Sequence, residues 1–384
     1  MIIEILFWSS LILIAYAYIG YPIFITLISL FVNNEVEKTD IEPYVSLLIT
    51  AYNEERDIKT KLENSLVLDY PKDRLEIVVA SDGSTDATDA IVKKYQNNEK
   101  GIKIILHRVE GRVGKTATQN SAVKICRGEI IIFSDAASMY DRNAIRALVR
   151  NYADPHVGAV SGMYTYDNKE GASVGFATIL FWNLENFIKS RQTKIKTITG
   201  CCGCIYSVRK DLYTELPATI ISDLVEPLMI LKKGYRIVFE PEARAVEETT
   251  GKTMEEFNMR VRVIVRGMTG MLFAKDLFNP LKYPFVSFQL ISHKLVRWLV
   301  SVFCIAVFAS SAVLAVSSQF YALIFILQLC FYSLAGLGYF MEKRGIYKIF
   351  FYLPLYFCIV NLAVLVSIFK VLKGENIVIW QTNR

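Results

Sequence analysis

The chain has 384 residues, a formal net charge of +6 at pH 7 and a hydrophobic content of 53%. The modest charge, with no stripe of interleaved basic and aromatic residues, argues against a nucleic-acid-binding protein. The seven cysteines show no framework of paired positions, which excludes a small disulfide-stapled secreted domain and fits a reducing compartment.

Long apolar stretches lie near both ends of the chain. Residues 5–32, 298–341 and 349–369 contain no charged side chain. A helix needs about 20 apolar residues to cross the hydrocarbon core of a membrane. A cleavable signal peptide fits the first stretch poorly, because its start lacks positive charge and the stretch is long. We therefore predict one N-terminal and three C-terminal spans, at about 6–32, 298–316, 320–341 and 349–370.

Between these spans, residues 38–280 alternate short apolar runs with helical patterns. Up to residue 135, the pattern predicts strands at 45–50, 75–80, 102–106 and 129–134, and helices at 58–68, 87–94 and 115–124. Further along, it predicts helices at 142–152, 173–191, 223–233 and 254–277, and strands at 157–164, 205–208 and 236–240. This alternation is typical of an α/β domain with a mostly parallel, doubly wound sheet.

Two predicted strands end in aspartate. The run LEIVVASD places Asp82 in a glycine-containing turn, and the run EIIIFSD ends in Asp135. In open α/β sheets, ligands bind in the crevice outside the carboxyl ends of the strands. Either aspartate could instead form a turn or cap a helix, as Asp often does. The pair favours a site for a sugar nucleotide and its metal ion.

A series of short motifs resembles the membrane-embedded family 2 glycosyltransferases, over about residues 45–275. The motifs are Ala51-Tyr52-Asn53-Glu54, Ser81 to Asp86, Gly114-Lys115, Ser134-Asp135-Ala136, Gly200 with Gly203, Ser222-Asp223, and Arg262 with Arg266. The family includes cellulose, hyaluronan, chitin and poly-N-acetylglucosamine synthases. The resemblance implies a GT-A (Rossmann-like) sheet domain inserted between one N-terminal and about three C-terminal transmembrane helices. We expect the domain at 38–280, an N-terminal helix in 1–37, and an interfacial helix with the C-terminal spans in 281–384.

The same resemblance implies a donor site. Residues 51–54 and Asp82 would hold the uridine, with Glu54 and Asp82 accepting hydrogen bonds from the base or ribose. The substrate-binding residues that the motifs imply are Ala51, Asn53, Glu54, Asp82, Ser84, Lys115, Asp135, Gly200, Gly203, Arg262 and Arg266. Lys115 would contact the nucleotide or its phosphates, although a surface lysine at a helix start is the alternative. Small residues around Gly200 and Gly203 would bring the backbone close to a ligand.

The resemblance also implies the reacting groups. Asp135 matches the first position of an Asp-x-Asp motif that binds Mg²⁺ or Mn²⁺. Asp223 matches the general base of a Thr-Glu-Asp motif, with a helix N-cap as the alternative. Arg262 and Arg266 lie where the family carries a Gln-x-x-Arg-Trp motif for pyrophosphate and the acceptor. For Arg266, the alternative is the basic face of a helix on the membrane surface.

An inverting glycosyl transfer requires a carboxylate base, an oxygen ligand for a metal ion and a cationic group for the leaving diphosphate. One carboxylate takes the proton from the acceptor hydroxyl. A hard divalent cation with oxygen ligands neutralises the departing diphosphate. A guanidinium matches phosphate oxygens in pairs. Asp223, Asp135 and Arg266 would supply these three functions.

The sequence departs from the family pattern at three places. Ala137 stands where the second Asp of Asp-x-Asp would be, which leaves one protein carboxylate for the metal. Ile221-Ser222-Asp223 replaces Thr-Glu-Asp, so only the base is kept. Gly267 follows Arg266 in place of tryptophan, which puts processive polymerisation in question.

The expected activity is inverting transfer of a hexose or N-acetylhexosamine from a UDP-sugar to a polysaccharide or membrane-borne glycan. The expected partners are the UDP-sugar, a glycan or lipid-linked acceptor, the bilayer and, for extrusion, an oligomer or export partners. Two alternatives are transfer to a polyprenyl phosphate carrier and a non-catalytic membrane scaffold, which Ala137 supports. We expect a multi-pass protein of the cell membrane with a catalytic domain that is cytosolic if it uses a nucleotide sugar. Lys343 and Arg344, in the loop between the third and fourth spans, also indicate a cytoplasmic side. One C-terminal segment could be re-entrant or interfacial.

Overall fold

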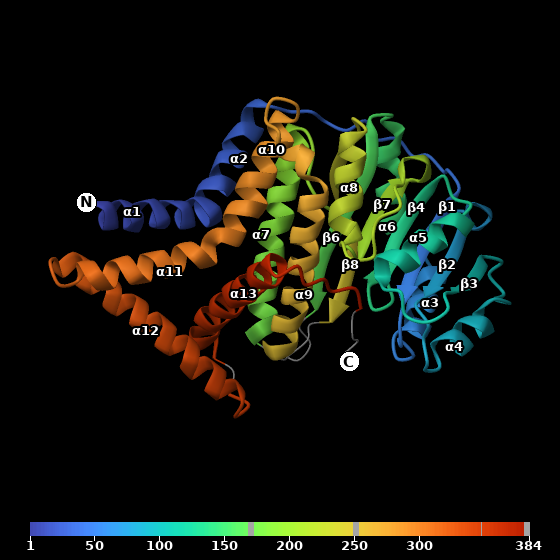
Figure 1. Cartoon of the computed structure of the whole chain (residues 1–384). Coiled ribbons are helices and arrows are strands. Elements are labelled where there is room, and N and C mark those ends of the chain that lie inside the picture. The colour runs from blue at the N-terminus through green and yellow to red at the C-terminus, as the bar shows by residue number, and fades with distance from the viewer. Residues whose placement is uncertain (168–172, 249–252, 347, 380–384) are drawn as a thin grey trace.

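The computed structural model describes all residues except 168–172, 249–252, 347 and 380–384. It consists of an α/β part and a group of long helices that extend from one side of it (Figure 1). The α/β part is built on an eight-stranded sheet with the strand order β3-β2-β1-β4-β7-β6-β8-β5. The strands are β1 (Val45–Ala51), β2 (Leu75–Ser81), β3 (Lys103–Arg108), β4 (Ile130–Asp135), β5 (Met139–Tyr140), β6 (Val157–Asp167), β7 (Ile205–Arg209) and β8 (Arg236–Glu248).

Strands β1 to β4 form the parallel half of the sheet, and they bring three predicted motifs to one edge. In the register between neighbours, Ala51 lies opposite Ser81 and Thr50 lies opposite Asp135. The carboxyl ends of β1, β2 and β4 therefore meet where the predicted nucleotide site should be. Beyond β4 the sheet is mixed, because β7 runs antiparallel to both β4 and β6, and β6 pairs with β8 in parallel.

Helices cover both faces of this sheet. They are α3 (Ile58–Leu66), α4 (Thr88–Tyr95), α5 (Lys115–Ile125), α6 (Ala144–Val149), α7 (Ser173–Ile195), α8 (Ser222–Lys232) and α9 (Thr253–Phe273). Leu47 and Ile49 of β1 pack into one core cluster, while Leu48 packs into the cluster on the opposite face. Strands buried on both faces read as continuous apolar runs, which is why β1 and β4 were visible in the sequence.

The predicted elements of the α/β part are present, and most differ only slightly at their ends. The exception is β8, which was predicted to end at 240 and continues to Glu248. The mostly parallel α/β sheet is confirmed. The two-residue strand β5 was not predicted, since so short a run has no periodicity to detect. The helix expected at 142–152 ends its α-helical part at Val149 and continues as a 3₁₀ turn to Ala153.

Four helices in the described chain are long and apolar enough to cross a membrane, as the sequence predicted. They cover Ile2–Phe31, Pro284–Leu314, Gln319–Glu342 (α12) and Phe350–Leu372. The first joins α1 (Ile2–Ala15) to α2 (Tyr21–Phe31) through a π-helical segment, and the second joins α10 (Pro284–Gln289) to α11 (Val296–Leu314) in the same way. Such π segments are a known cause of bends. Figure 1 shows both helices bending, so that α1 and α11 leave the α/β part while α2, α10 and α7 run along it.

The segment after α13 (Ile349–Leu372) returns to the α/β part. Ile377 packs against Val261 and Val265 of α9. Gly114, which precedes α5, has a φ of +88°, and a Cβ built on it would lie 2.7 Å from the carbonyl oxygen of Val378. This segment therefore lies directly against the start of α5.

Candidate active site

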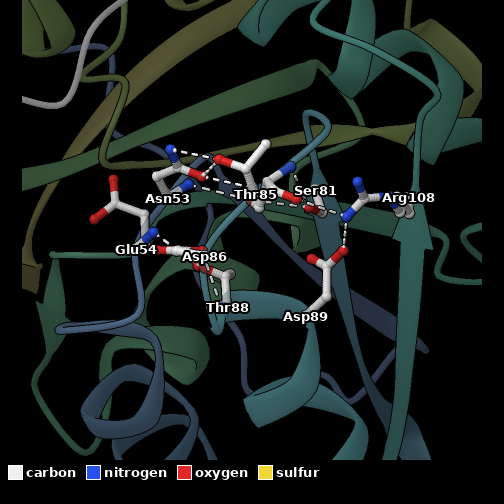
Figure 2. Close-up of polar contacts among 9 residues, drawn as sticks. Asn53, Glu54, Ser81, Thr85, Asp86, Thr88, Asp89 and Arg108 are labelled. Atoms are coloured by element: carbon white, nitrogen blue, oxygen red, sulfur yellow. Dashed lines mark hydrogen bonds and ion pairs between the residues drawn. The ribbon is translucent and has the colours of Figure 1, made fainter.

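The loops after β1 and β2 are fastened to each other by polar side chains (Figure 2). Asn53 has a φ of +52°, a region that Asn tolerates better than most residues. Its Oδ1 accepts a hydrogen bond from the backbone N–H of Thr85 at 2.8 Å. Its own N–H donates to Ser84 Oγ at 3.2 Å. Asn53 and Ser84, both predicted to touch the substrate, thus hold the shape of the loop pair.

Asp86 and Glu54 form further hydrogen bonds between the loops after β1 and β2. Asp86 Oδ1 accepts from the backbone N–H of Thr88, the first residue of α4, at 3.0 Å and from its hydroxyl at 2.6 Å. The Glu54 N–H donates to Thr88 Oγ1 at 2.8 Å. In Figure 2, the Glu54 carboxylate points away from this cluster. The contact of Glu54 with uridine stays a prediction.

Asp82 has a structural task in this loop system. It is fully buried, and Oδ1 accepts from the N–H of Val113 at 2.8 Å and from the hydroxyl of Thr118 at 3.0 Å. Oδ2 accepts from the N–H of Gly114 at 3.1 Å. Asp82 thereby ties the end of β2 to the start of α5. A contact with base or ribose stays a prediction, and this carboxylate would have to share its acceptor atoms to make one.

Lys115 and Asp135 form an ion pair across the edge of the sheet. Lys115 is the first residue of α5, Asp135 ends β4, and their side chains are 24% and 35% exposed. Burial alone would lower the pKa of Lys115, but the carboxylates of Asp135 and Asp223 outweigh it and raise that pKa. Lys115 thus carries a firmly held positive charge at the predicted phosphate position.

Asp223 lies in the first turn of α8, beside this ion pair. Its Oδ1 is buried and has no hydrogen-bond partner within the described part of the chain, so Asp223 does not act as the helix cap that was the alternative. Burial raises its pKa, and the cations of Lys115 and Arg266 reduce that effect. A Cβ built on Gly203 would lie 2.7 Å from Asp223 Oδ2, so the carboxylate fills the space that the missing side chain leaves. Gly200 lies next to α8 in the same way, because its Cβ would meet Leu224 Cδ1 at 3.0 Å.

Arg266 and Arg262 project from α9 toward these carboxylates. Arg266 is 5% exposed, and its Nη2 donates to Thr116 Oγ1 at 2.8 Å and to the carbonyl oxygen of Ile220 at 2.6 Å. It therefore braces the loop before α8 and is not part of an exposed basic face. Burial lowers the pKa of Arg266 to about 10. Burial also lowers the pKa of Arg262, which lies within electrostatic range of Asp135.

Two buried lysines belong to this region and were missed in the sequence. Lys61 of α3 is fully buried, and its Nζ donates to the carbonyl oxygen of Ser138, just after Asp135. The sequence feature that could have indicated its burial is its position beside Leu62, on the apolar face of a predicted helix. Lys189 of α7 is 6% exposed and lies within electrostatic range of Asp223. Its position in a long amphipathic helix gave no signal that it would face a distant carboxylate.

The donor set fits a divalent cation only when substrate oxygens complete it. Of the two Asp-x-Asp positions, Asp135 carries a carboxylate and Ala137 brings none. The described residues contain no group of three or more His, Cys, Asp or Glu side chains placed to hold a metal. Mg²⁺ is commonly held by one or two carboxylates together with water and substrate phosphates. Asp135, which is partly exposed, fits that mode of binding.

The balance of charge at the site favours a bound anion. Cations outnumber carboxylates there: Lys115, Arg262 and Arg266 face Asp135 and Asp223. Closely spaced cations in a buried site repel one another unless anionic groups join them. A diphosphate would supply the missing negative charge. The site can thus hold a diphosphate next to a carboxylate that is free to accept a proton.

Comparisons with known proteins agree with this geometry. Residues 46–216 match the family described as glycosyl transferase family 2. The chain is 29% identical, over 246 residues, to poly-beta-1,6-N-acetyl-D-glucosamine synthase of Staphylococcus aureus, covering 62% of this chain and 57% of that protein. It is 30% identical, over 216 residues, to the probable glycosyltransferase YdaM of Bacillus subtilis, covering 54% and 51%. The chain therefore spans about half the length of these curated relatives.

A solved structure matches nearly the whole chain. It is the mannosyltransferase PcManGT from Pyrobaculum calidifontis in complex with GDP-Man and Mn²⁺, with a TM-score of 0.73, 21% identity, and coverage of 96% of this chain and 99% of that one. At this identity the match speaks for the fold. The match of residues 46–216 and the sheet show an α/β part of GT-A fold whose sequence is similar to the family 2 glycosyltransferases. In the described chain, a helix before this part and three after it are long and apolar enough to cross a membrane.

Proposed function

We propose that this protein transfers a hexose or N-acetylhexosamine, with inversion, from a UDP-sugar to a polysaccharide or membrane-borne glycan. The observation that carries the proposal is the Asp223 carboxylate, which has a free buried oxygen and lies within electrostatic range of the Lys115–Asp135 pair. Asp223 as the base, Lys115 as an anchored cation and Asp135 as an oxygen ligand for a metal would thereby act together at the carboxyl edge of the sheet.

The proposed reaction is a single displacement at the anomeric carbon. Asp223 takes the proton of the acceptor hydroxyl, and the hydroxyl oxygen attacks the anomeric carbon of the donor sugar. The bond between that carbon and the β-phosphate oxygen breaks, and its electron pair leaves with UDP. Attack from the face opposite the leaving group inverts the anomeric configuration. The raised pKa of Asp223 suits a general base, because proton transfer is most effective when the base is not too weak.

Cations around the site would stabilise the departing UDP. Lys115 is held at the start of α5 and Arg262 lies within electrostatic range of Asp135, so both are placed to meet negative charge on the diphosphate. Mg²⁺ or Mn²⁺ on Asp135, when bound, would neutralise the same oxygens as a Lewis acid. Arg266 would act at the same place by holding the loop before α8 in position.

The identity of the donor rests on the resemblance to glycan synthases. The Staphylococcus aureus relative is named as a poly-N-acetylglucosamine synthase, whereas the Pyrobaculum calidifontis structure contains GDP-Man. UDP is the nucleotide that we propose for this chain. The Asn53 loop, the Asp82 turn and Ser84 form the wall at which its base and ribose would lie.

The acceptor would approach from the side of the membrane helices. Gly267 replaces the family tryptophan, but the ring of Trp298 from α11 lies 3.5 Å from where a Cβ on Gly267 would be. An aromatic ring is therefore present at this place, supplied by another helix. We propose the three parts 1–37, 38–280 and 281–384 for the chain, with the catalytic part on the cytosolic side, where nucleotide sugars are found.

The test is a donor screen with the full chain in nanodiscs. UDP release and the anomeric configuration of the product are measured with each common UDP-sugar and with Mg²⁺ or Mn²⁺. Asp223→Asn and Asp135→Ala should each lower turnover at least about 100-fold, whereas the exposed control Asp73→Asn should leave it unchanged. Full activity in both site variants would overturn the assignment, and no turnover of any donor would favour a membrane scaffold. Activity that survives Asp223→Asn alone would favour transfer to a polyprenyl phosphate, which needs no hydroxyl base.

A further inference from the structure

Three cations meet where α7 passes the bend between α10 and α11. We call Lys189, Lys294 and Arg297 the basic corner. Lys189 is 6% exposed, and the Arg297 side chain is 14% exposed. The Glu185 carboxylate pairs with Arg297 and lies 3.1 Å from His293 Nε2. Of the three cations, Arg297 is thus the one with an ion-pair partner among the described residues.

The basic corner is not satisfied by the protein itself. The buried Nε and Nη2 of Arg297 have no hydrogen-bond partner in the described structure. Among the described residues, neither lysine forms a hydrogen bond or an ion pair, and Lys189 Nζ lies over the ring of Trp182 at 5.7 Å from its centre. A buried cation without a partner is costly. Several buried cations without partners are expected to lie together where an anion binds.

The basic corner adjoins the reacting carboxylate. Both Lys189 and Lys294 lie within electrostatic range of Asp223. The proposed donor diphosphate has its own cations, Lys115 and Arg262, which do not belong to the basic corner. An anion at the basic corner would therefore reach Asp223 from the membrane side, which is the side of the acceptor.

An apolar groove lies further along α11. It has a volume of about 270 Å³ and is lined by side chains such as Leu11, Ile14, Val307, Leu327, Phe331 and Phe357. Tyr18 connects it with the basic corner, because Tyr18 is within electrostatic range of Arg297 and its ring lies 6.1 Å from that of Phe357. At 1.5 Å per residue, Val307 lies about 15 Å along α11 from Arg297. A ligand with a charged head at the basic corner and an apolar chain in the groove would match the distance between the two.

We propose that the basic corner and the groove bind a lipid that carries the acceptor glycan through a phosphate or diphosphate. The phosphate oxygens are held by Lys189, Lys294 and Arg297, the hydrocarbon chain lies in the groove, and the glycan end reaches Asp223. Guanidinium and ammonium groups are the usual partners of phosphate oxygens. This assignment names the acceptor class of the proposed function, and it rests on that function.

Binding of farnesyl diphosphate to the full chain in detergent tests the site. Farnesol and inorganic pyrophosphate serve as the two halves of the probe, and all titrations contain saturating UDP so that the donor site is filled. We expect farnesyl diphosphate to bind at least about tenfold more tightly than either half, since charge-assisted contacts and chain burial act together. Equal affinity for pyrophosphate would mean a site for free phosphate, and equal affinity for farnesol would mean simple partition into the groove. Either result would overturn the proposal.

Charge variants then locate the binding. Lys189→Gln and Lys294→Gln should each raise the Kd for farnesyl diphosphate about tenfold or more, and Lys189→Arg should restore most of the affinity. Lys282→Gln is the matched control, because it removes the same charge from the exposed loop before α10 and should change the Kd less than about twofold. Unfolding temperatures are measured for each variant, so that a misfolded protein is recognised. Unchanged affinity in the folded variants of the basic corner would refute the assignment.

The same preparation separates this proposal from the one it rests on. If UDP binds and UDP-sugar is turned over, but the lipid probe does not bind, the lipid site alone is wrong. If UDP itself does not bind, the glycosyltransferase assignment of the site fails.

Discussion

Lys61 makes a strong prediction about stability, because an ionised lysine at its position is costly. Its side chain is 0% exposed, its Nζ donates to the carbonyl oxygen of Ser138, and the ammonium lies 3.8 Å from the centre of the Tyr140 ring. Burial lowers the pKa of Lys61 from 10.5 to about 7, although the nearby carboxylate of Asp135 opposes the change. At about 1.36 kcal/mol per pH unit, this difference corresponds to about 5 kcal/mol of unfolding free energy.

The sign of the effect follows from proton binding. The folded-state pKa lies below the unfolded one, so between pH 7 and about 10.5 the unfolded chain holds a proton that the folded chain has lost. The contribution of Lys61 to the free energy of unfolding therefore rises with pH across this window. Below pH 7, the full destabilisation from the buried ammonium is present. Lys61→Met removes that cost while keeping most of the side-chain volume. We expect the variant to be more stable than the wild type at pH 6, by a few kcal/mol at most, and the difference to shrink toward pH 10.

The assay is tryptophan-monitored thermal unfolding in detergent at closely spaced pH values from 6 to 10. The quantity of interest is the difference in unfolding temperature between Lys61→Met and the wild type, since other titrating groups cancel in it. Lys59→Met, an exposed neighbour on the same helix, is the control and should give a difference that does not change with pH. A difference for Lys61→Met that is equally flat, or that grows with pH, would refute the reasoning.

Three further predictions concern the site. Because burial raises the pKa of Asp223, the acid limb of the kcat/KM profile should lie above the usual range of an aspartate, about 4. Lys115→Gln should shift that limb to higher pH, and an unmoved or lowered limb in the pH–rate profile would contradict the assignment. Gly203→Ala should lower kcat about 100-fold with little change in UDP affinity, because the new Cβ would displace Asp223 Oδ2; kinetics and UDP titration would check this, and an unchanged kcat would count against the contact. Arg266→Gln should lower both the unfolding temperature and kcat, since it removes charged hydrogen bonds worth about 1.5–3 kcal/mol each; loss of activity at full thermal stability would show that Arg266 acts on the substrate instead.

The sequence predicted the fold well where local patterns were strong. The strands around Leu48 and Phe133 were visible because buried parallel strands are apolar throughout. The antiparallel placement of β7 was not, since strand direction depends on pairing between residues distant in the chain. The structure brings several motif residues to one edge of the sheet, but the sequence did not predict their contacts. That Asp82 would be occupied by backbone donors, or that Lys189 would face Asp223, depends on tertiary packing that no local spacing encodes.

The contact between Val378 and Gly114 has a consequence for how the molecule is made. The α/β part leaves the ribosome early, with α5 among its first helices, whereas Val378 follows all four apolar helices. Domains generally begin to fold during synthesis, from the N-terminal side. The surface at the start of α5 would nonetheless stay uncovered until α13 has been made and Val378, which follows it, has packed against Gly114. A nascent chain of this protein would thus assemble its sheet first and complete the candidate site only as one of its last steps, after the four apolar helices have been made.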